Sequence, residues 1–172
     1  MIALALPGDL KKIYALPAGT MVTLSGEVLT MRDKAHAHII ELLNSKKEIP
    51  VTLRNAVVYY CGPTEGMEGF PAGSCGPTTS KRMDPYTPLL LASGVRVMIG
   101  KGKRSEMVIE AIKKYGAVYL VTLGGLGAYL SARITKCSPV AYKEWGPEAI
   151  YKMCIQDFPA LVAVDAKGRS IY

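Results

Sequence analysis

Short apolar segments alternate with amphipathic ones along most of this chain, and this alternation constrains its fold more than any other feature. The apolar segments are rich in β-branched and aromatic residues and are bounded by glycine or proline, as buried strands are. The strands predicted in this way cover residues 21–30, 56–61, 95–100 and 117–123. The helices predicted between them cover residues 33–43, 88–93, 106–116 and a segment that follows the glycines at 124–127. Repeated β–α units predict an α/β domain, a mixed sheet flanked by helices in two or three layers.

The C-terminal part of the chain has a different pattern. Residues 134–142, 151–158 and 161–165 are predicted as strands, and DAKG at 165–168 as a hairpin turn that leads into the last four residues. Only the segment around residues 145–150 is predicted to be helical there.

Length and composition bound the number of domains. The chain has 172 residues, of which 49% are hydrophobic and 20% charged, which is enough to bury one sizeable core. We therefore expect a single domain over residues 1–172. The first lysines follow the N-terminal apolar run instead of preceding it, and no apolar stretch is long enough to cross a bilayer. We expect a cytoplasmic protein without a membrane segment.

The four cysteines are far apart in sequence. Cys61, Cys75, Cys137 and Cys154 form no C-x-x-C pair of the kind that creates a local metal or redox site. Free Cys usually packs as a small apolar residue, so we predict free thiols and no metal held by this chain alone.

The formal charge of +7 is compatible with nucleic acid, an acidic partner or a small acidic ligand. The densest basic cluster, KGKRS at 101–105, is short, and acidic residues are interspersed among the other cations. The sequence contains no RNP-type motif, zinc finger or basic heptad region. A site for a small anion therefore fits better than a nucleic-acid surface.

Two adjoining segments are predicted as a long functional loop. Residues 62–77 contain eight glycines and prolines at short intervals, and SCGPTTSKRMDPYTP at 74–88, which overlaps this range, adds several hydroxyl side chains, two cations and further prolines. Proline removes a backbone donor and breaks helical and strand patterns, and loops this long in compact domains are usually functional or disordered.

Four residues in and around these segments are candidates for binding or chemistry. In GPTTSKR, backbone N–H groups and the Thr78 hydroxyl can converge on an anion, and Arg82 adds a planar fork that matches a carboxylate. An ordinary N-cap followed by a surface Lys-Arg pair explains the same residues equally well. Lys101 lies between two glycines at the end of a predicted strand. Ligand crevices of α/β sheets occur at this position, but a lysine that is simply solvated there explains the pattern equally well.

Arg32 and Asp33 lie at the junction of the first predicted strand and helix, with His36 one turn later. Arg32 could bind a substrate carboxylate while Asp33 caps the helix. Pairing of Arg32 with Asp33 or with a partner's surface is the simpler local explanation.

Several motifs together resemble one enzyme family. They are RDKAH at 32–36, YCGPT at 60–64, SCGPTTSKRMDPYTPLLL at 74–91, MIGKG at 98–102, GPEAI at 146–150 and DFPALVAVDAKG at 157–168. In this order they resemble the β-subunit of class I, iron–sulfur fumarate hydratases, which is also the C-terminal half of the single-chain enzymes and is closely related to the β-subunit of L(+)-tartrate dehydratase.

The resemblance implies a swivelling β/β/α domain that forms one wall of an active site. It implies a [4Fe-4S] cluster held by a partner α-subunit and not by this chain, in an assembly with two copies of each subunit, and an isolated chain that can self-associate. By motif, Arg32, Arg82 and Lys101 would bind the C4-dicarboxylate substrate, and Thr78 would be the catalytic base, activated by a carboxylate of the partner.

The expected reaction is the reversible hydration of fumarate to (S)-malate, catalysed only together with the α-subunit. Two alternatives remain open from the sequence. One is the dehydration of tartrate to oxaloacetate by the same cations, and the other is a non-catalytic anion-binding module of the same fold.

Overall fold

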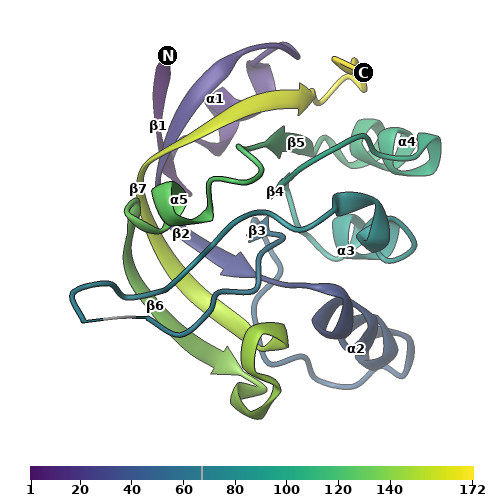
Figure 1. Ribbon diagram of the computed structural model, residues 1–172. Coiled ribbons are helices and arrows are strands. Elements are labelled where there is room, and N and C mark those ends of the chain that lie inside the picture. Colours follow the sequence, from purple (N-terminus) through teal and green to yellow (C-terminus); the bar gives the residue numbers. More distant parts are fainter. Residues whose placement is uncertain (67) are drawn as a thin grey trace.

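The computed structural model describes residues 1–66 and 68–172, and within them it contains one mixed sheet with helices packed against it (Figure 1). The strands are β1 (Ile2–Leu6), β2 (Met21–Thr30), β3 (Val57–Tyr59), β4 (Val97–Gly100), β5 (Val118–Val121), β6 (Ile134–Ala141) and β7 (Ile150–Val164). The α-helices are α1 (Leu10–Ala15), α2 (Asp33–Asn44), α3 (Thr87–Ala92), α4 (Glu106–Tyr115) and α5 (Gly127–Ser131). Two 3₁₀ turns, η1 (Ser80–Met83) and η2 (Lys143–Glu148), complete the elements in the described ranges. This arrangement confirms the predicted α/β class.

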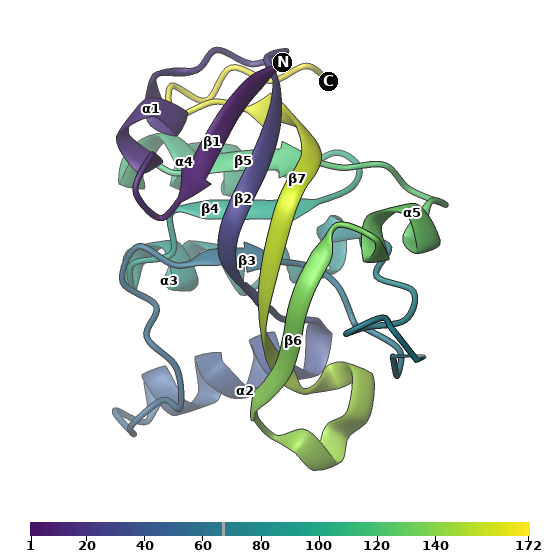
Figure 2. The same cartoon turned by 90° about the vertical axis from the view of Figure 1, so that its left-hand side faces the viewer.

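The sheet closes on itself. Its strand order is β1-β2-β3-β4-β5-β7-β6, and β2 also pairs with β7, so β2, β3, β4, β5 and β7 form a ring. Strands β1 to β5 pair with one another in parallel, whereas β7 runs antiparallel to β2, β5 and β6. Figure 2 shows β1, β2, β7 and β6 in front, crossing β3, β4 and β5 behind them.

Strict alternation along β3, β4 and β5 separates two cores. Tyr59, Ile99 and Leu120 point into the ring, where they meet apolar residues of β1, β2 and β7. Val58 and Met98 point outward, against the apolar faces of α2, α3 and α4. Side chains on successive strand residues face opposite sides, so these strands bury both faces. The result is three layers, in the order strand, strand, helix (Figure 1).

Most of the predicted elements are present, but three features differ from expectation. No strand or helix was predicted before residue 21, yet β1 pairs in parallel with β2, and α1 follows it. Residues 151–158 and 161–165 are one strand, because β7 continues through Pro159. A register shift accommodates this, with Asp157 at φ 49° and its N–H donated to Ser25 Oγ at 3.0 Å.

The stretch 74–88 is less irregular than predicted. Its second half forms η1 and the start of α3, and Pro88 lies in the first turn of α3, where a missing N–H is harmless. Within residues 62–66 and 68–77 the structure has no helix or strand, as expected, and residue 67 of this loop lies outside the described residues.

The predicted helix ends are right in one case and shifted in another. Gly116 ends α4 in the left-handed conformation, with φ 63°. Arg32, not Asp33, occupies the N-cap position of α2, so Asp33 is the first helical residue and its side chain is available for other contacts. In the described part of the chain, no helix has the length and hydropathy needed to cross a membrane.

Candidate functional site

The predicted site residues lie at one edge of the sheet. Because β2, β3, β4 and β5 are parallel, their carboxyl ends meet at the same edge. Arg32 follows β2, Lys101 follows β4, and the Thr78 N–H donates to the Tyr60 carbonyl just beyond β3, at 2.7 Å. In open α/β sheets this edge is where ligands bind.

Hydrogen bonds join the segment 78–82 to the end of β4. Thr79 pairs with Lys101 as an isolated parallel bridge, and the Ser80 N–H donates to the Lys101 carbonyl at 3.2 Å. In return the Lys101 N–H donates to Ser80 Oγ at 3.0 Å. Gly100 makes this close approach possible, since a Cβ there would collide with Ser80 Oγ and lie 2.9 Å from the Tyr60 ring.

Arg82 links the hydroxyl and acidic groups at this edge. Its guanidinium donates to Thr78 Oγ1, and it lies 3.4 Å from the Asp33 carboxylate at the start of α2. The side chains of Arg82 and Asp33 are 49% and 38% exposed, so the group is open to a ligand. The carboxylate that was expected to cap α2 therefore pairs with Arg82.

Arg32 lies beside this group and contacts a residue that sequence reasoning missed. Its Nε is 3.2 Å from a carboxylate oxygen of Glu148, and the other oxygen accepts the Lys34 N–H at 3.1 Å, at the N-terminus of α2. A Cβ on Gly62 would be 2.7 Å from Arg32 Nη1 and from the Pro147 carbonyl, so this glycine leaves room for the guanidinium. Glu148 lies in the GPEAI motif, and this motif was the feature of the sequence that could have drawn attention to it.

His36 fixes the backbone of Arg32. Its ring is fully buried, and Nδ1 lies 2.8 Å from the Arg32 carbonyl oxygen. Burial lowers the pKa of His36 to about 4, so the ring is neutral near pH 7 and Nδ1 carries the proton that it donates to Arg32. Among the described residues, Nε2 has no hydrogen-bond partner.

The Lys101 side chain runs toward the loop after β5. Its Cδ lies 3.5 Å from the position that a Cβ on Gly124 would take. The structure thus brings the Thr78 and Arg82 side chains into direct contact and joins the Lys101 backbone to the same segment through Ser80. Arg32 is the chain neighbour of Asp33, which pairs with Arg82, and its own side chain pairs with Glu148. Three cations with two carboxylates leave a net positive edge, which suits an anion.

Cys61 and Cys75, which each precede a glycine–proline pair, do not fit a solvent-facing metal centre. Cys61 and Cys75 are fully buried in the ring core, and a hydrogen bond with Cys75, together with burial, raises the pKa of the Cys61 thiol well above its ordinary value. Thiolates, not thiols, ligate metals. Within residues 1–66 and 68–172, no three His, Cys, Asp or Glu side chains are grouped to hold a metal ion.

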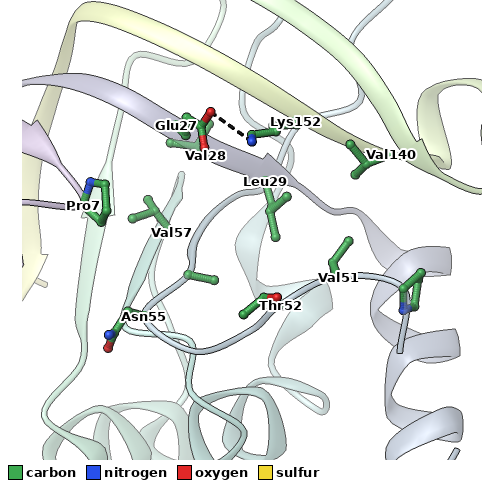
Figure 3. A pocket seen from close by; sticks show the side chains of 12 residues that line it. Pro7, Glu27, Val28, Leu29, Val51, Thr52, Asn55, Val57, Val140 and Lys152 are labelled. Carbon is green, nitrogen blue, oxygen red and sulfur yellow. Dashed lines mark ion pairs between the residues drawn. The ribbon is translucent and has the colours of Figure 1, made fainter. Parts of the chain in front are cut away.

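A hollow of about 370 Å³ lies away from this edge, near the amino end of β3 (Figure 3). Val57, Asn55 and Val51 line it together with the ion pair between Glu27 and Lys152, whose charged atoms are 3.0 Å apart. None of the four predicted site residues borders this hollow.

The fold and the candidate site define an α/β domain with two arginines, a lysine and a threonine at the carboxyl edge of its parallel strands. The family model for the fumarase C-terminus matches residues 1–172, and the chain belongs to this family. The resemblance predicted from the motifs is therefore confirmed.

Three relatives illustrate the match. The chain is 41% identical over 165 residues to the anaerobic class I fumarate hydratase of Escherichia coli, covering 95% of this chain and 30% of that protein. It is 40% identical over 164 residues to fumarate hydratase 2 of Leishmania major, covering 94% and 29%. It is 34% identical over 168 residues to the putative L(+)-tartrate dehydratase subunit beta of Methanocaldococcus jannaschii, covering 94% and 86%. The chain thus spans about 30% of the fumarate hydratases but most of the tartrate dehydratase subunit.

Proposed function

We propose that this chain is the β-subunit of a heteromeric hydro-lyase that interconverts fumarate plus water with (S)-malate. In the proposal, the partner is an α-subunit that carries a [4Fe-4S] cluster, and this chain supplies substrate-binding cations and a hydroxyl. The observation that carries it is the contact of Arg82 with Thr78, together with the backbone pairing of Lys101 to the same segment, at the carboxyl edge of a domain of the fumarase C-terminal family.

The charges of this edge suit a C4 diacid. Such a substrate brings two carboxylates, and Arg82 and Arg32 each offer a planar fork that can bind one of them by paired hydrogen bonds. Asp33 and Glu148 hold these arginines until the substrate carboxylates compete for them. Fixed cations also stabilise the negative charge that spreads onto a carboxylate when the adjacent C–H loses its proton.

Thr78 has the contacts expected of a proton-transferring hydroxyl. The Arg82 guanidinium donates to its oxygen, and a neighbouring cation favours the alkoxide form over the neutral alcohol. In the direction of dehydration, Thr78 Oγ1 would remove the proton next to the carboxylate. In the direction of hydration it would return that proton. The carboxylate that activates Thr78 belongs, in this proposal, to the α-subunit.

Comparison with the relatives supports a subunit of a larger enzyme. The chain matches only about 30% of the single-chain fumarate hydratases, and it matches 86% of a protein named as a beta subunit. We therefore propose an α-subunit as the partner. An assembly with two copies of each chain and a cytoplasmic location complete the proposal; they come from the motif resemblance and the sequence, and not from these coverages.

The test is anaerobic co-expression with the α-subunit, followed by assays on fumarate, malate and tartrate. We expect turnover of fumarate and malate by the complex and none by this chain alone. Turnover of tartrate, with no turnover of malate, would show that tartrate is the substrate in place of malate and fumarate. Dicarboxylate binding by the isolated chain, with no turnover in any complex, would favour a non-catalytic anion-binding module.

One pair of variants tests the site within that complex. Arg82→Ala should lower kcat/KM by roughly 10- to 150-fold, the loss expected when a hydrogen bond to a charged group disappears. Lys81→Ala is the matched control, because Lys81 lies on the same turn and is exposed. Equal activities of the two variants, with the complex intact, would reject the assignment of Arg82.

A further inference from the structure

Arg104 belongs to the basic cluster KGKRS, yet it is not a surface residue. It is 2% exposed, and its side chain is among the largest that the protein buries completely. It lies in the layer between the sheet and α3 and α4, surrounded by the rings of Tyr60 and Tyr119. Neither the motif resemblance nor the proposed mechanism gives this buried charge a role.

Each nitrogen of the guanidinium has a hydrogen-bond partner. Nε lies 2.7 Å from the Asp84 carboxylate, Nη2 donates to Thr87 Oγ1 at 2.7 Å, and Nη1 donates to the Tyr60 hydroxyl at 3.3 Å. The group also lies over the Tyr119 ring, 4.8 Å from its centre. The second oxygen of Asp84 accepts the Ser105 N–H at 2.7 Å. Arg104 therefore fastens the end of η1 and the start of α3 to the loop between β4 and α4.

A second chain of contacts leads from Arg104 to Lys101. The Tyr119 hydroxyl lies 2.9 Å from both Ser80 Oγ and the Gly102 carbonyl oxygen. Ser80 Oγ in turn accepts the Lys101 N–H. Burial raises the pKa of Tyr119, so its hydroxyl keeps the proton needed for these bonds. The stacked pair of Arg104 and Tyr119 thus supports both the turn that carries Arg82 and the backbone of Lys101.

Stability alone is a poor explanation for such a group. Burying a charged pair costs desolvation energy, and well-packed apolar residues of similar volume often stabilise a core as much or more. A buried guanidinium with a partner at each nitrogen does fix the relative positions of the segments that it joins. Here those segments carry two of the three proposed substrate-binding cations.

We propose that Arg104 is a positioning residue that sets the spacing between Arg82 and Lys101, and so the fit of the dicarboxylate substrate, without touching the substrate. It acts through Asp84 and Thr87 on the side of Arg82, and through Tyr119 and Ser80 on the side of Lys101. The proposal rests on the dicarboxylate site proposed above, and it adds residues buried beneath that site.

The first experiment uses kinetics of the complex with the α-subunit. Tyr119→Phe keeps the ring and removes only the hydroxyl, so this variant should fold. We expect its KM for malate to rise roughly three- to tenfold, the effect of one lost neutral hydrogen bond, with a smaller change in kcat. Arg104→Met should raise KM further. Arg104→Lys, which keeps the charge but not the fork, should recover part of the loss.

Arg96→Met is the matched control. Arg96 lies just before β4, at the end of that strand opposite the site, and its guanidinium donates to the Leu91 and Val95 carbonyls at 2.9 Å. A merely structural arginine should lower stability in the same way when it is replaced. We expect this variant to leave KM unchanged, and an unchanged KM in Tyr119→Phe and Arg104→Met would overturn the proposal.

Hydrogen exchange on the full chain separates this inference from the proposed function. In Tyr119→Phe the Ser80 and Lys101 amides should exchange faster, while the Val118 amide, bonded to the Arg96 carbonyl at 2.9 Å, should keep its wild-type rate. Faster exchange at the Ser80 and Lys101 amides, in a complex that turns over no substrate, would refute the proposed function. It would still support the role of the Arg104–Tyr119 pair in holding these two segments. Unchanged exchange at both amides would refute the positioning role whatever the enzyme does.

Discussion

Acid should destabilise this protein through His36 by an amount that the structure determines. The pKa of His36 is about 4 in the folded chain, against an ordinary value near 6.5, because burial opposes the charged ring. The faces of the ring contact Tyr60 and Tyr86, and the charge of Arg104 opposes protonation further. In the unfolded chain the same ring binds a proton below about pH 6.5.

The sign of the effect follows from this difference. Above pH 6.5 the ring is neutral in both states, and titration of His36 costs the folded state no stability. As the pH falls from 6.5 toward 4, only the unfolded state binds the proton, and the free energy of unfolding decreases. Linkage gives a loss of about 2 kcal/mol at pH 5 and about 3 kcal/mol at pH 4, relative to pH 8. Other groups also titrate in this range, so only a comparison between variants isolates His36.

The assay is urea unfolding of the wild type, His36→Gln and His38→Gln at pH 8, 6 and 5. The stability difference between the wild type and His36→Gln should shrink by about 2 kcal/mol from pH 8 to pH 5, since glutamine binds no proton. His38 lies on the same helix with its side chain 33% exposed, and replacing it controls for changes in α2 itself. Parallel loss of stability in the wild type and His36→Gln would show that His36 is not held neutral by burial.

Two further predictions concern close packing near the site. Gly62→Ala should displace the Arg32 guanidinium, because a Cβ would lie 2.5 Å from Arg32 Cδ, and it should raise KM for malate in the complex by roughly tenfold. Gly8→Ala is the control, because its Cβ would meet nothing closer than 3.8 Å, and it should leave KM unchanged. Equal effects of the two substitutions would count against a role for Arg32. Cys61 and Cys75 should resist alkylation at pH 8 until the chain unfolds, because both are fully buried and the pKa of Cys61 is raised by its bond with Cys75 and by burial. Mass spectrometry of native and urea-treated protein checks this, and rapid modification of the native chain would contradict it.

The parts of the fold that sequence predicted are those with local signals. Strands β3, β4 and β5 were visible as apolar runs that end at glycine or proline, and α4 through its apolar period and Gly116. The closure of β2 on β7 was not visible, because it joins residues more than a hundred positions apart. The continuation of β7 past Asp157 was hidden for a related reason, since proline and a left-handed residue usually end a strand unless a partner accepts the irregularity.

Candidate site residues could be named from the sequence where a side chain carries chemistry at its own position. Arg82, Thr78 and Lys101 stood out by residue type and flanking glycines, whereas the partners that hold them did not. Arg104 looked like part of a solvated basic cluster, and Glu148 lies more than a hundred residues from the Arg32 that it contacts. Burial and long-range pairing assign these roles, and neither can be read from a local pattern.

The ring of strands also limits how a ligand can be enclosed. In a ring of strands that is hydrogen-bonded all the way round, every strand end is held by neighbours on both sides, so Arg32 and Lys101, which follow β2 and β4, start from fixed points on one rim. If a small molecule binds between that rim and the proposed α-subunit, closure over it would be a rotation of the whole ring of strands as one rigid body. The hinge for such a motion would then lie between the subunits, not within this chain.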